Sequence, residues 1–251
     1  MGIRDNRYTA QVPRVVGALA LRRRVHATEA VLCRQHTSRT LKFTLPGPMP
    51  IVDTIADRYY GDKVKLAFAV AELLNQEARG LVADGVDVIQ FDEPAFNVYL
   101  PEAAGWGVAA LERASAGLNC TTCVHICYDY GIQANIDWKR SLGEEWRQYA
   151  EVFPALARSH LTQVSLECAG SRVPPHLMEL LAGKDVLVGV IDVASERVES
   201  VEEVAGTLAL ARRYVDREHL VACTNCGMAP MTWAAATAKL NALVQGPAMA
   251  V

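Results

Sequence analysis

Six short apolar segments alternate with helix-like segments along most of this chain, and this alternation restricts the fold more than any other feature. The segments begin near residues 41, 86, 120, 161, 186 and 220. Residues 186–193 are almost wholly apolar, as expected for a strand buried on both faces of a parallel sheet. Strands that alternate with helices favour parallel pairing through right-handed crossovers. The sequence therefore predicts an α/β fold.

The segments between these strands carry helix signals. Residues 63–83 have apolar side chains at helical spacing, and Ser200 with Glu203 forms a capping-box pattern at the start of another helix. We also predict helices over residues 106–117, 137–158, 174–181 and 233–244, the third opening with a proline. In residues 1–40, residues 12–21 offer at most one strand, and a basic, helix-like segment continues to Val31.

The length of 251 residues suits one (β/α)8 barrel, since barrels of this class have about 250 residues. No linker or low-complexity segment divides the chain. We therefore expect a single catalytic domain over residues 1–251, in which residues 41–251 form βα units and residues 1–40 form a poorly assigned N-terminal segment.

Composition excludes several classes of partner. The formal net charge is −3 and the sequence pI about 6.1, which argues against a nucleic-acid-binding surface. No apolar run approaches the roughly 20 residues of a membrane span, and the first residues lack a signal-peptide core. Seven cysteines, an odd number, are better explained by reduced thiols and metal binding than by a disulfide framework. These features predict a cytoplasmic protein with no nucleic-acid or membrane partner.

Polar residues collect where the predicted strands end, and in barrels the carboxyl-terminal rim carries the site. Five successive strand ends offer a side chain that can bind a ligand: Asp92, His125 with Cys127, Glu167, Asp192 and Cys226.

The sequence Cys-Val-His-Ile-Cys at residues 123–127 points to a metal. Alternate residues of a strand share one face, so Cys123, His125 and Cys127 would point the same way. One imidazole, two thiolates from Cys127 and Cys226, and the Glu167 carboxylate make a donor set that suits Zn²⁺.

Plainer roles remain open for each of these four residues. A buried histidine can be a satisfied core residue, a cysteine a small apolar side chain or a loop thiol, and Glu167 a salt-bridged rim carboxylate. The pairs Cys120/Cys123 and Cys223/Cys226 also form two Cys-x-x-Cys motifs. Their separation of about 100 residues is far from the 15–20 typical of a zinc ribbon, and no helix opens directly at either pair.

The predicted donor set also indicates a reaction. A metal with two thiolate ligands is electron-rich and poorly suited to activating water, but it can hold a substrate thiol as thiolate at neutral pH. Carboxylate is the hardest of the four ligands and would yield to an incoming sulfur. The pattern therefore favours alkylation of a small thiol.

Four motifs together resemble the catalytic barrel of cobalamin-independent methionine synthase, in its short "core" form. They are Gln90-Phe91-Asp92-Glu93-Pro94-Ala95, His125-Ile126-Cys127-Tyr128, Ser165-Leu166-Glu167-Cys168 and Thr224-Asn225-Cys226-Gly227-Met228. The resemblance implies a (β/α)8 TIM-barrel type of fold, with His125, Cys127, Glu167 and Cys226 as zinc ligands. It also implies that Asp92 binds the amino group of homocysteine, although Asp92 could instead form the turn before Pro94.

The resemblance implies a zinc-dependent transfer of a methyl group to homocysteine, forming methionine. The methyl donor would be a methylated corrinoid protein, methyltetrahydrofolate or a group delivered by a partner protein. One alternative is a related zinc methyltransferase acting on another small thiol of the coenzyme M type, for which Asp92 would lack a purpose. Another is a truncated, non-catalytic barrel that binds zinc.

The chain departs from the family pattern in three places. The family's first two strands, which help to bind the amino acid, have no counterpart, so the chain resembles strands three to eight of the barrel. Ala194 stands where full-length enzymes carry a proton-donating histidine, and Val98 where they carry a second carboxylate. A folate leaving nitrogen needs a proton and a corrinoid leaving group does not, so Ala194 puts the folate donor in doubt.

Overall fold

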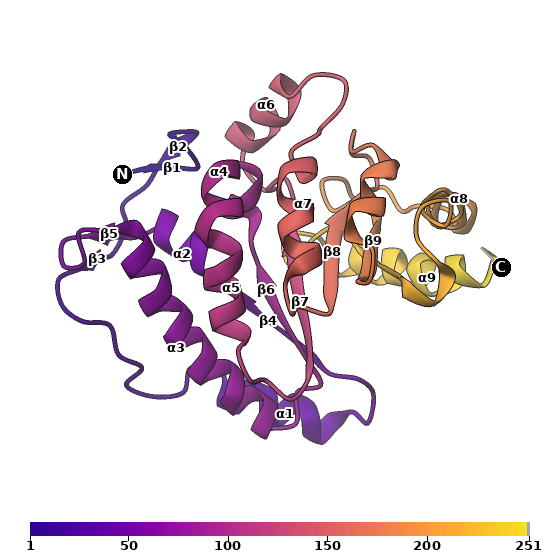
Figure 1. Ribbon diagram of the computed structural model, residues 1–251. Coiled ribbons are helices and arrows are strands. Elements are labelled where there is room, and N and C mark those ends of the chain that lie inside the picture. The colour runs from indigo at the N-terminus through magenta and orange to yellow at the C-terminus, as the bar shows by residue number, and fades with distance from the viewer. Residues whose placement is uncertain (250–251) are drawn as a thin grey trace. The chain divides into compact units, whose positions relative to one another are not determined.

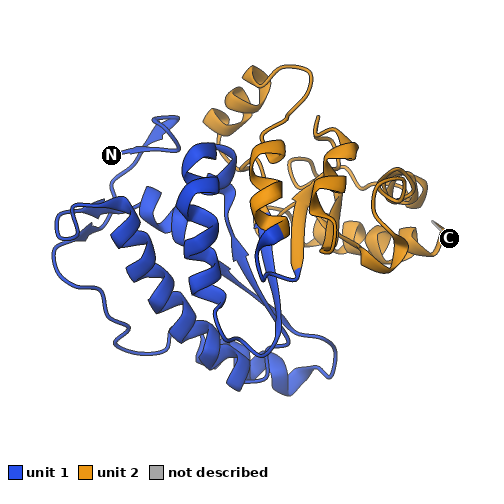
Figure 2. Ribbon diagram, in the orientation of Figure 1, with its two compact units in different colours: residues 1–125, 158–162 blue, residues 126–157, 163–251 orange. Residues whose placement is uncertain are grey.

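The computed structural model describes residues 1–249 and divides into two compact units (Figure 2). The first unit contains residues 1–125 and 158–162, and the second contains residues 126–157 and those from 163 onward. Each unit contains parallel strands and helices, and the first unit also contains one short antiparallel pair of strands. The prediction of a single domain over residues 1–251 stays a prediction.

The first unit contains the parallel strands β4, β6 and β7, a separate short parallel pair of β3 and β5, and the long helix α3. Strand β6 pairs in parallel with both β4 and β7, and the register sets Asp92 opposite His125 at the strand ends. The elements, shown in Figure 1, are β1 (Gly2–Ile3), β2 (Tyr8–Thr9), β3 (Arg14–Val15), α1 (Ala27–His36), β4 (Lys42–Pro46), α2 (Pro48–Asp53), β5 (Ala56–Asp57), α3 (Lys63–Ala83), β6 (Val88–Asp92), η1 (Pro94–Asn97), α4 (Leu100–Glu102), η2 (Ala103–Gly107), α5 (Val108–Ser115) and β7 (Thr121–Ile126).

Helix α3 shows how local sequence sets the first unit. The Asp62 carboxylate caps its start by accepting hydrogen bonds from the backbone N–H groups of Val64 and Lys65. Its apolar face, which includes the fully buried Leu66 and Leu81, packs in the core, and α3 lies beside α5 (Figure 1).

The second unit is also built on parallel strands, with β9 between β8 and β10. The capping box predicted at Ser200 and Glu203 is present, and α8 packs against α9. The elements are α6 (Gln133–Ser141), α7 (Tyr149–Arg158), β8 (Gln163–Glu167), η3 (Pro175–Leu181), β9 (Asp185–Ile191), α8 (Val201–Ala211), η4 (Arg217–His219), β10 (Leu220–Thr224) and α9 (Trp233–Met249).

The predicted α/β class is confirmed, since the six expected strands form at the expected places with parallel neighbours. No closed barrel is present among residues 1–249. Within that range, no helix combines the length and apolar character needed to cross a membrane.

One local prediction was wrong, and two other elements are shorter or of a more specific type than the sequence indicated. Residues 137–158 do not form one helix: α6 and α7 are separated by a loop in which Gly143 has φ +82°, a left-handed conformation that ends a helix. The helix predicted over residues 174–181 is present as a 3₁₀ helix at Pro175–Leu181. Only Arg14–Val15 of the possible strand 12–21 is extended and paired, and the pairing is with the short strand β5.

Candidate metal centre

Three of the four predicted metal ligands lie together. The imidazole of His125 and the sulfurs of Cys127 and Cys226 all lie within 4.8 Å of one another. His125 is the second-last residue of β7, Cys127 comes just after that strand, and Cys226 lies in the loop after β10. His125 and Cys127 are buried, at 3% and 4% exposed.

The geometry of this group fits zinc. The two sulfurs are 3.9 Å apart. Two Zn–S bonds of about 2.3 Å at a tetrahedral angle would place their sulfurs roughly 3.8 Å apart. The neighbouring Cys226 thiol and burial raise the pKa of the Cys127 thiol well above its usual value. A cation is what would favour the thiolate form here. No disulfide forms among the seven cysteines, all of which lie in the described part of the chain.

A turn fixed by Asn225 positions Cys226. The fully buried Asn225 side chain accepts hydrogen bonds from the backbone N–H groups of Cys168 and Ala169, both at 3.1 Å. Its amide nitrogen donates to the Ala169 carbonyl at 2.7 Å and to the Tyr130 hydroxyl at 3.2 Å. These four bonds tie the turn that carries Cys226 to the segment that follows β8.

An irregularity at the end of β10 brings this turn into place. The pairing with β9 shifts register between Cys223 and Thr224, and such a bulge turns the following residues in a new direction. Gly189 on β9 permits the close approach, because a Cβ there would overlap the Asn225 side chain and lie 2.6 Å from the Leu166 carbonyl. The hydroxyl of Thr224 donates to the Cys226 carbonyl at 2.8 Å.

Glu167, the fourth predicted ligand, ends β8 and is 3% exposed. One carboxylate oxygen accepts a hydrogen bond from the Tyr128 backbone N–H at 2.8 Å, and the other is paired with the Lys139 ammonium at 3.0 Å. The group formed by His125, Cys127 and Cys226 does not include Glu167 among the residues that the structure describes. The assignment of all four residues as ligands stays a prediction.

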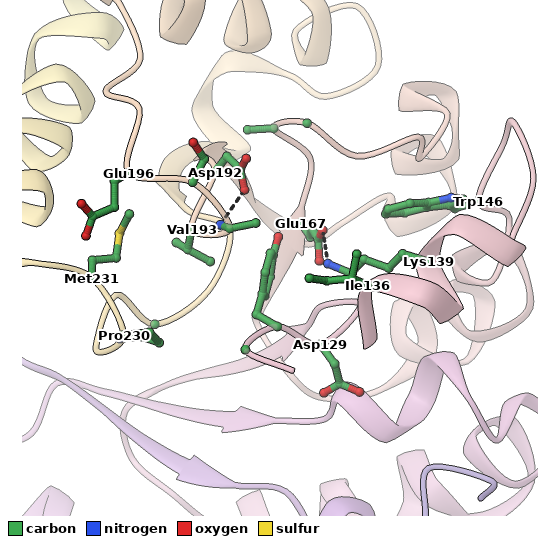
Figure 3. A pocket seen from close by; sticks show the side chains of 17 residues that line it. Asp129, Ile136, Lys139, Trp146, Glu167, Asp192, Val193, Glu196, Pro230 and Met231 are labelled. Carbon is green, nitrogen blue, oxygen red and sulfur yellow. Dashed lines mark hydrogen bonds and ion pairs between the residues drawn. The ribbon is translucent and has the colours of Figure 1, made fainter. Parts of the chain in front are cut away.

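Glu167 lines a cavity of about 480 Å³ in the second unit (Figure 3). Lys139 and Trp146 face this space from α6 and the loop before α7, and Asp192 and Glu196 face it from the segment after β9. Apolar side chains, among them Met231, complete the lining. The cavity therefore combines an apolar wall with several charged groups, as small-molecule sites do.

Ala194 also lines this cavity, in the segment between β9 and α8. The Asp192 carboxylate accepts a hydrogen bond from the Ala194 backbone N–H at 2.8 Å. Lys239 of α9, which is fully buried, anchors the segment by donating to the Asp192 carbonyl at 2.9 Å and pairing with Glu199 at 3.0 Å. The segment that carries Ala194 is thus held by several polar contacts, and Ala194 presents only a methyl group. Its correspondence with a proton-donating histidine stays a prediction.

Asp92, the predicted amino-acid ligand, ends β6 in the first unit. Its carboxylate accepts a hydrogen bond from the Gln90 side chain at 2.8 Å, and its backbone carbonyl accepts one from the Gly47 N–H at 2.8 Å. The role of Asp92 in substrate binding stays a prediction.

Two residues beside the centre were missed by the sequence analysis. Asn225 was quoted within a motif without a role, although an asparagine directly before a candidate cysteine ligand was a usable signal. Lys139 lay inside a helix whose polar face predicts only solvent exposure, so no sequence pattern indicated its contact with Glu167.

Comparisons with known proteins relate this chain to one family. The family described as "Cobalamin-independent synthase, Catalytic domain" matches residues 5–248. A methionine synthase of Saccharolobus islandicus is 32% identical over 210 residues, which are 82% of this chain and 57% of that protein. The chain thus spans little more than half the length of this curated relative.

Solved structures show the same likeness. A B12-independent methionine synthase from Shewanella sp. W3-18-1, solved in complex with selenomethionine, superposes with a TM-score of 0.96 at 52% identity, covering 99% of this chain and 73% of that one. A putative vitamin-B12-independent methionine synthase from Listeria monocytogenes shares the fold, with a TM-score of 0.70 at 14% identity over 94% of this chain and 72% of that one. The family match over nearly the whole chain, together with the thiol pair and its histidine, shows that this chain belongs to the catalytic-domain family of cobalamin-independent synthases.

Proposed function

We propose that this protein is a zinc-dependent methyltransferase that transfers a methyl group to the thiol of homocysteine and forms methionine. The observation that carries the proposal is the group of His125, Cys127 and Cys226, with ligand atoms within 4.8 Å of one another. Family membership and the solved relative with bound selenomethionine, the selenium counterpart of the proposed product, support it.

Different residues of the chain would bind the metal and the substrate. His125, Cys127 and Cys226 would hold the metal, with Glu167 as the fourth, exchangeable ligand. When bound there, zinc would lower the pKa of the substrate thiol so that it attacks as thiolate. Asp92 would bind the substrate ammonium by an ion pair. The thiolate would form a bond to the donor's methyl carbon while the donor group leaves with the electron pair of the broken bond.

Ala194 bears on the methyl donor. A leaving nitrogen must be protonated, and a methyl side chain at this place in the cavity wall cannot supply a proton. A donor whose leaving group needs no proton, such as a methylated corrinoid protein, suits this site better than methyltetrahydrofolate. Delivery of the methyl group by a partner protein is the remaining option.

The metal is tested by measuring zinc per chain in the purified protein. We expect one equivalent in the unmutated protein, and nearly complete loss in Cys127→Ala and Cys226→Ala, since removing a ligand should cost more than the roughly 10–100-fold typical of an outer-shell change. Cys223→Ala is the matched control, because its sulfur lies 3.7 Å from the Ser165 hydroxyl and outside the metal group. Zinc-free unmutated protein would contradict the proposal.

The reaction is tested by turnover with each donor in turn. Homocysteine and coenzyme M are compared as acceptors, and methyltetrahydrofolate and a methylated corrinoid protein as donors. We expect homocysteine to be preferred and Asp92→Ala to raise its KM, because the ammonium loses its partner. Equal use of coenzyme M, together with an unaffected Asp92→Ala variant, would favour the other thiol class.

A further inference from the structure

We propose that Lys139 is a positioning residue that holds the Glu167 carboxylate and so sets how tightly the centre retains its metal. This inference rests on the proposed function, because it assigns Glu167 to the metal. It concerns a residue of α6 that belongs to none of the motifs by which the family is identified.

The first support is the contact itself. The Lys139 ammonium is 3.0 Å from one oxygen of Glu167, and the two side chains are only 14% and 3% exposed. An ion pair so removed from solvent is weakly screened and geometrically defined, unlike a pair on the surface. The contact lies on the wall of the cavity (Figure 3).

The second support is that aromatic rings hold the ammonium in place. The Lys139 nitrogen lies 3.6 Å from the centre of the Tyr130 ring and 5.8 Å from that of Trp146. Such rings stabilise a cation through their negative faces. The Tyr130 hydroxyl accepts a hydrogen bond from Asn225, the residue before Cys226. Lys139 is therefore built into the surroundings of the centre rather than lying loosely across it.

The third support comes from the partners of the carboxylate, which differ in mobility. Besides the Tyr128 N–H and the Lys139 ammonium, the Tyr130 side chain hydrogen-bonds to Glu167. The Tyr128 N–H belongs to the backbone directly after Cys127 and cannot withdraw, whereas a lysine ammonium moves on a flexible stem. Glu167 can therefore turn toward a metal by exchanging Lys139 and keeping Tyr128. Conversely, Lys139 can receive the carboxylate when a substrate thiol takes its place.

Lys139 thus competes with the metal for one carboxylate. Its presence weakens metal retention but lowers the free energy needed to release Glu167 when the thiol arrives. Two opposite effects follow from removing the ammonium: the metal should be held more tightly, and homocysteine more weakly. A residue that only stabilised the fold would weaken both.

The experiment compares Lys139→Met with Lys139→Arg, which keeps the charge, in the full chain. Zinc affinity is measured by competition with a chromophoric chelator, and homocysteine affinity by titration of the zinc-loaded protein. In Lys139→Met we expect zinc to bind about tenfold tighter and homocysteine about tenfold weaker, at the lower end of outer-shell effects. Lys139→Arg should stay close to the unmutated protein.

Glu167→Gln provides the second background. If Lys139 acts through the Glu167 carboxylate, adding Lys139→Met to the Glu167→Gln variant should change neither the zinc affinity nor the homocysteine affinity. This absence of a further effect is the result that a double-mutant cycle gives when one residue acts only through the other. Zinc affinity that is unchanged or weaker in Lys139→Met overturns the inference while leaving the proposed function intact, provided that the unmutated protein binds zinc and turns over. Failure of the unmutated protein to bind zinc would contradict both the inference about Lys139 and the proposed function.

Discussion

Glu93 in the first unit and Glu167 in the second are both buried carboxylates at the end of a parallel strand, yet their surroundings differ. Glu93 follows β6 and is fully buried; one oxygen accepts a hydrogen bond from the Met49 N–H at 3.3 Å, and the other has no hydrogen-bond partner. Burial raises the pKa of Glu93 well above its usual value. Glu167 has a cation within ion-pair distance and a backbone donor on its other oxygen.

The different surroundings of Glu93 and Glu167 determine the role that each carboxyl group can have. A carboxyl group whose pKa is raised by burial takes up a proton more readily, and so behaves more like a packed, uncharged side chain. A carboxylate held by an ammonium remains available to a second cation. The buried acid of the first unit thus contributes to packing, whereas Glu167 of the second unit is already paired with a cation.

The largest effect is expected where the ion pair is broken. Glu167→Ala leaves the Lys139 ammonium without its anion in a largely buried place, which should lower the free energy of unfolding by about 3 kcal/mol. Urea denaturation of the metal-free protein measures this. The double variant Glu167→Leu, Lys139→Met should recover most of the loss. If Glu167→Ala unfolds at the same urea concentration as the unmutated protein, the pair contributes nothing to the second unit.

A smaller effect is expected from two matched glycines. Gly189 packs against Asn225 and Gly47 against Glu93, and in each case an added Cβ would overlap the neighbouring side chain. Both alanine variants should lose about 1–3 kcal/mol of stability through overpacking. Only Gly189→Ala should also weaken zinc binding, because it displaces the turn that carries Cys226. Zinc titration of both variants tests this. An equal loss of zinc affinity in the two would show that Gly189 has no particular role in positioning Cys226.

The smallest effect concerns the pH dependence of stability. Because the pKa of Glu93 is raised in the folded state, its stabilising contribution is complete below the ordinary value of 4.5 and is lost as pH rises toward the folded value. Glu93→Gln removes this loss. Because glutamine does not titrate, the variant should gain stability relative to the unmutated protein as pH rises over the range from pH 4.5 to pH 9. Thermal melts across that range measure the difference, and parallel curves for the two proteins would show that Glu93 ionises normally.

Much of the framework could be predicted from sequence because it depends on short-range patterns. Strand alternation, the Ser200 capping box and the helix over residues 63–83 all follow from neighbouring residues. The grouping of His125, Cys127 and Cys226 could be predicted because the ends of parallel strands meet at one rim.

The remaining features depend on contacts between distant segments. Gly143 was a sequence signal for the end of a helix, but the aromatic residues on either side of it suggested one continuous helix over residues 137–158. The partnership of Lys139 with Glu167 joins residues 28 positions apart and requires α6 to lie beside the end of β8. The register shift in β10 leaves no signal in the sequence, although it decides where Cys226 points.

That register shift, with the four hydrogen bonds of Asn225, has a thermodynamic consequence. The loop bearing Cys226 is ordered when the chain folds, so little conformational entropy remains to be lost when an ion is captured, and preorganisation of this kind raises affinity. The same coupling works in reverse. Any fluctuation that frays the carboxyl end of β10 should release the metal ion. The rate of metal loss would therefore measure the local opening of this strand, which precedes unfolding of the rest of the protein.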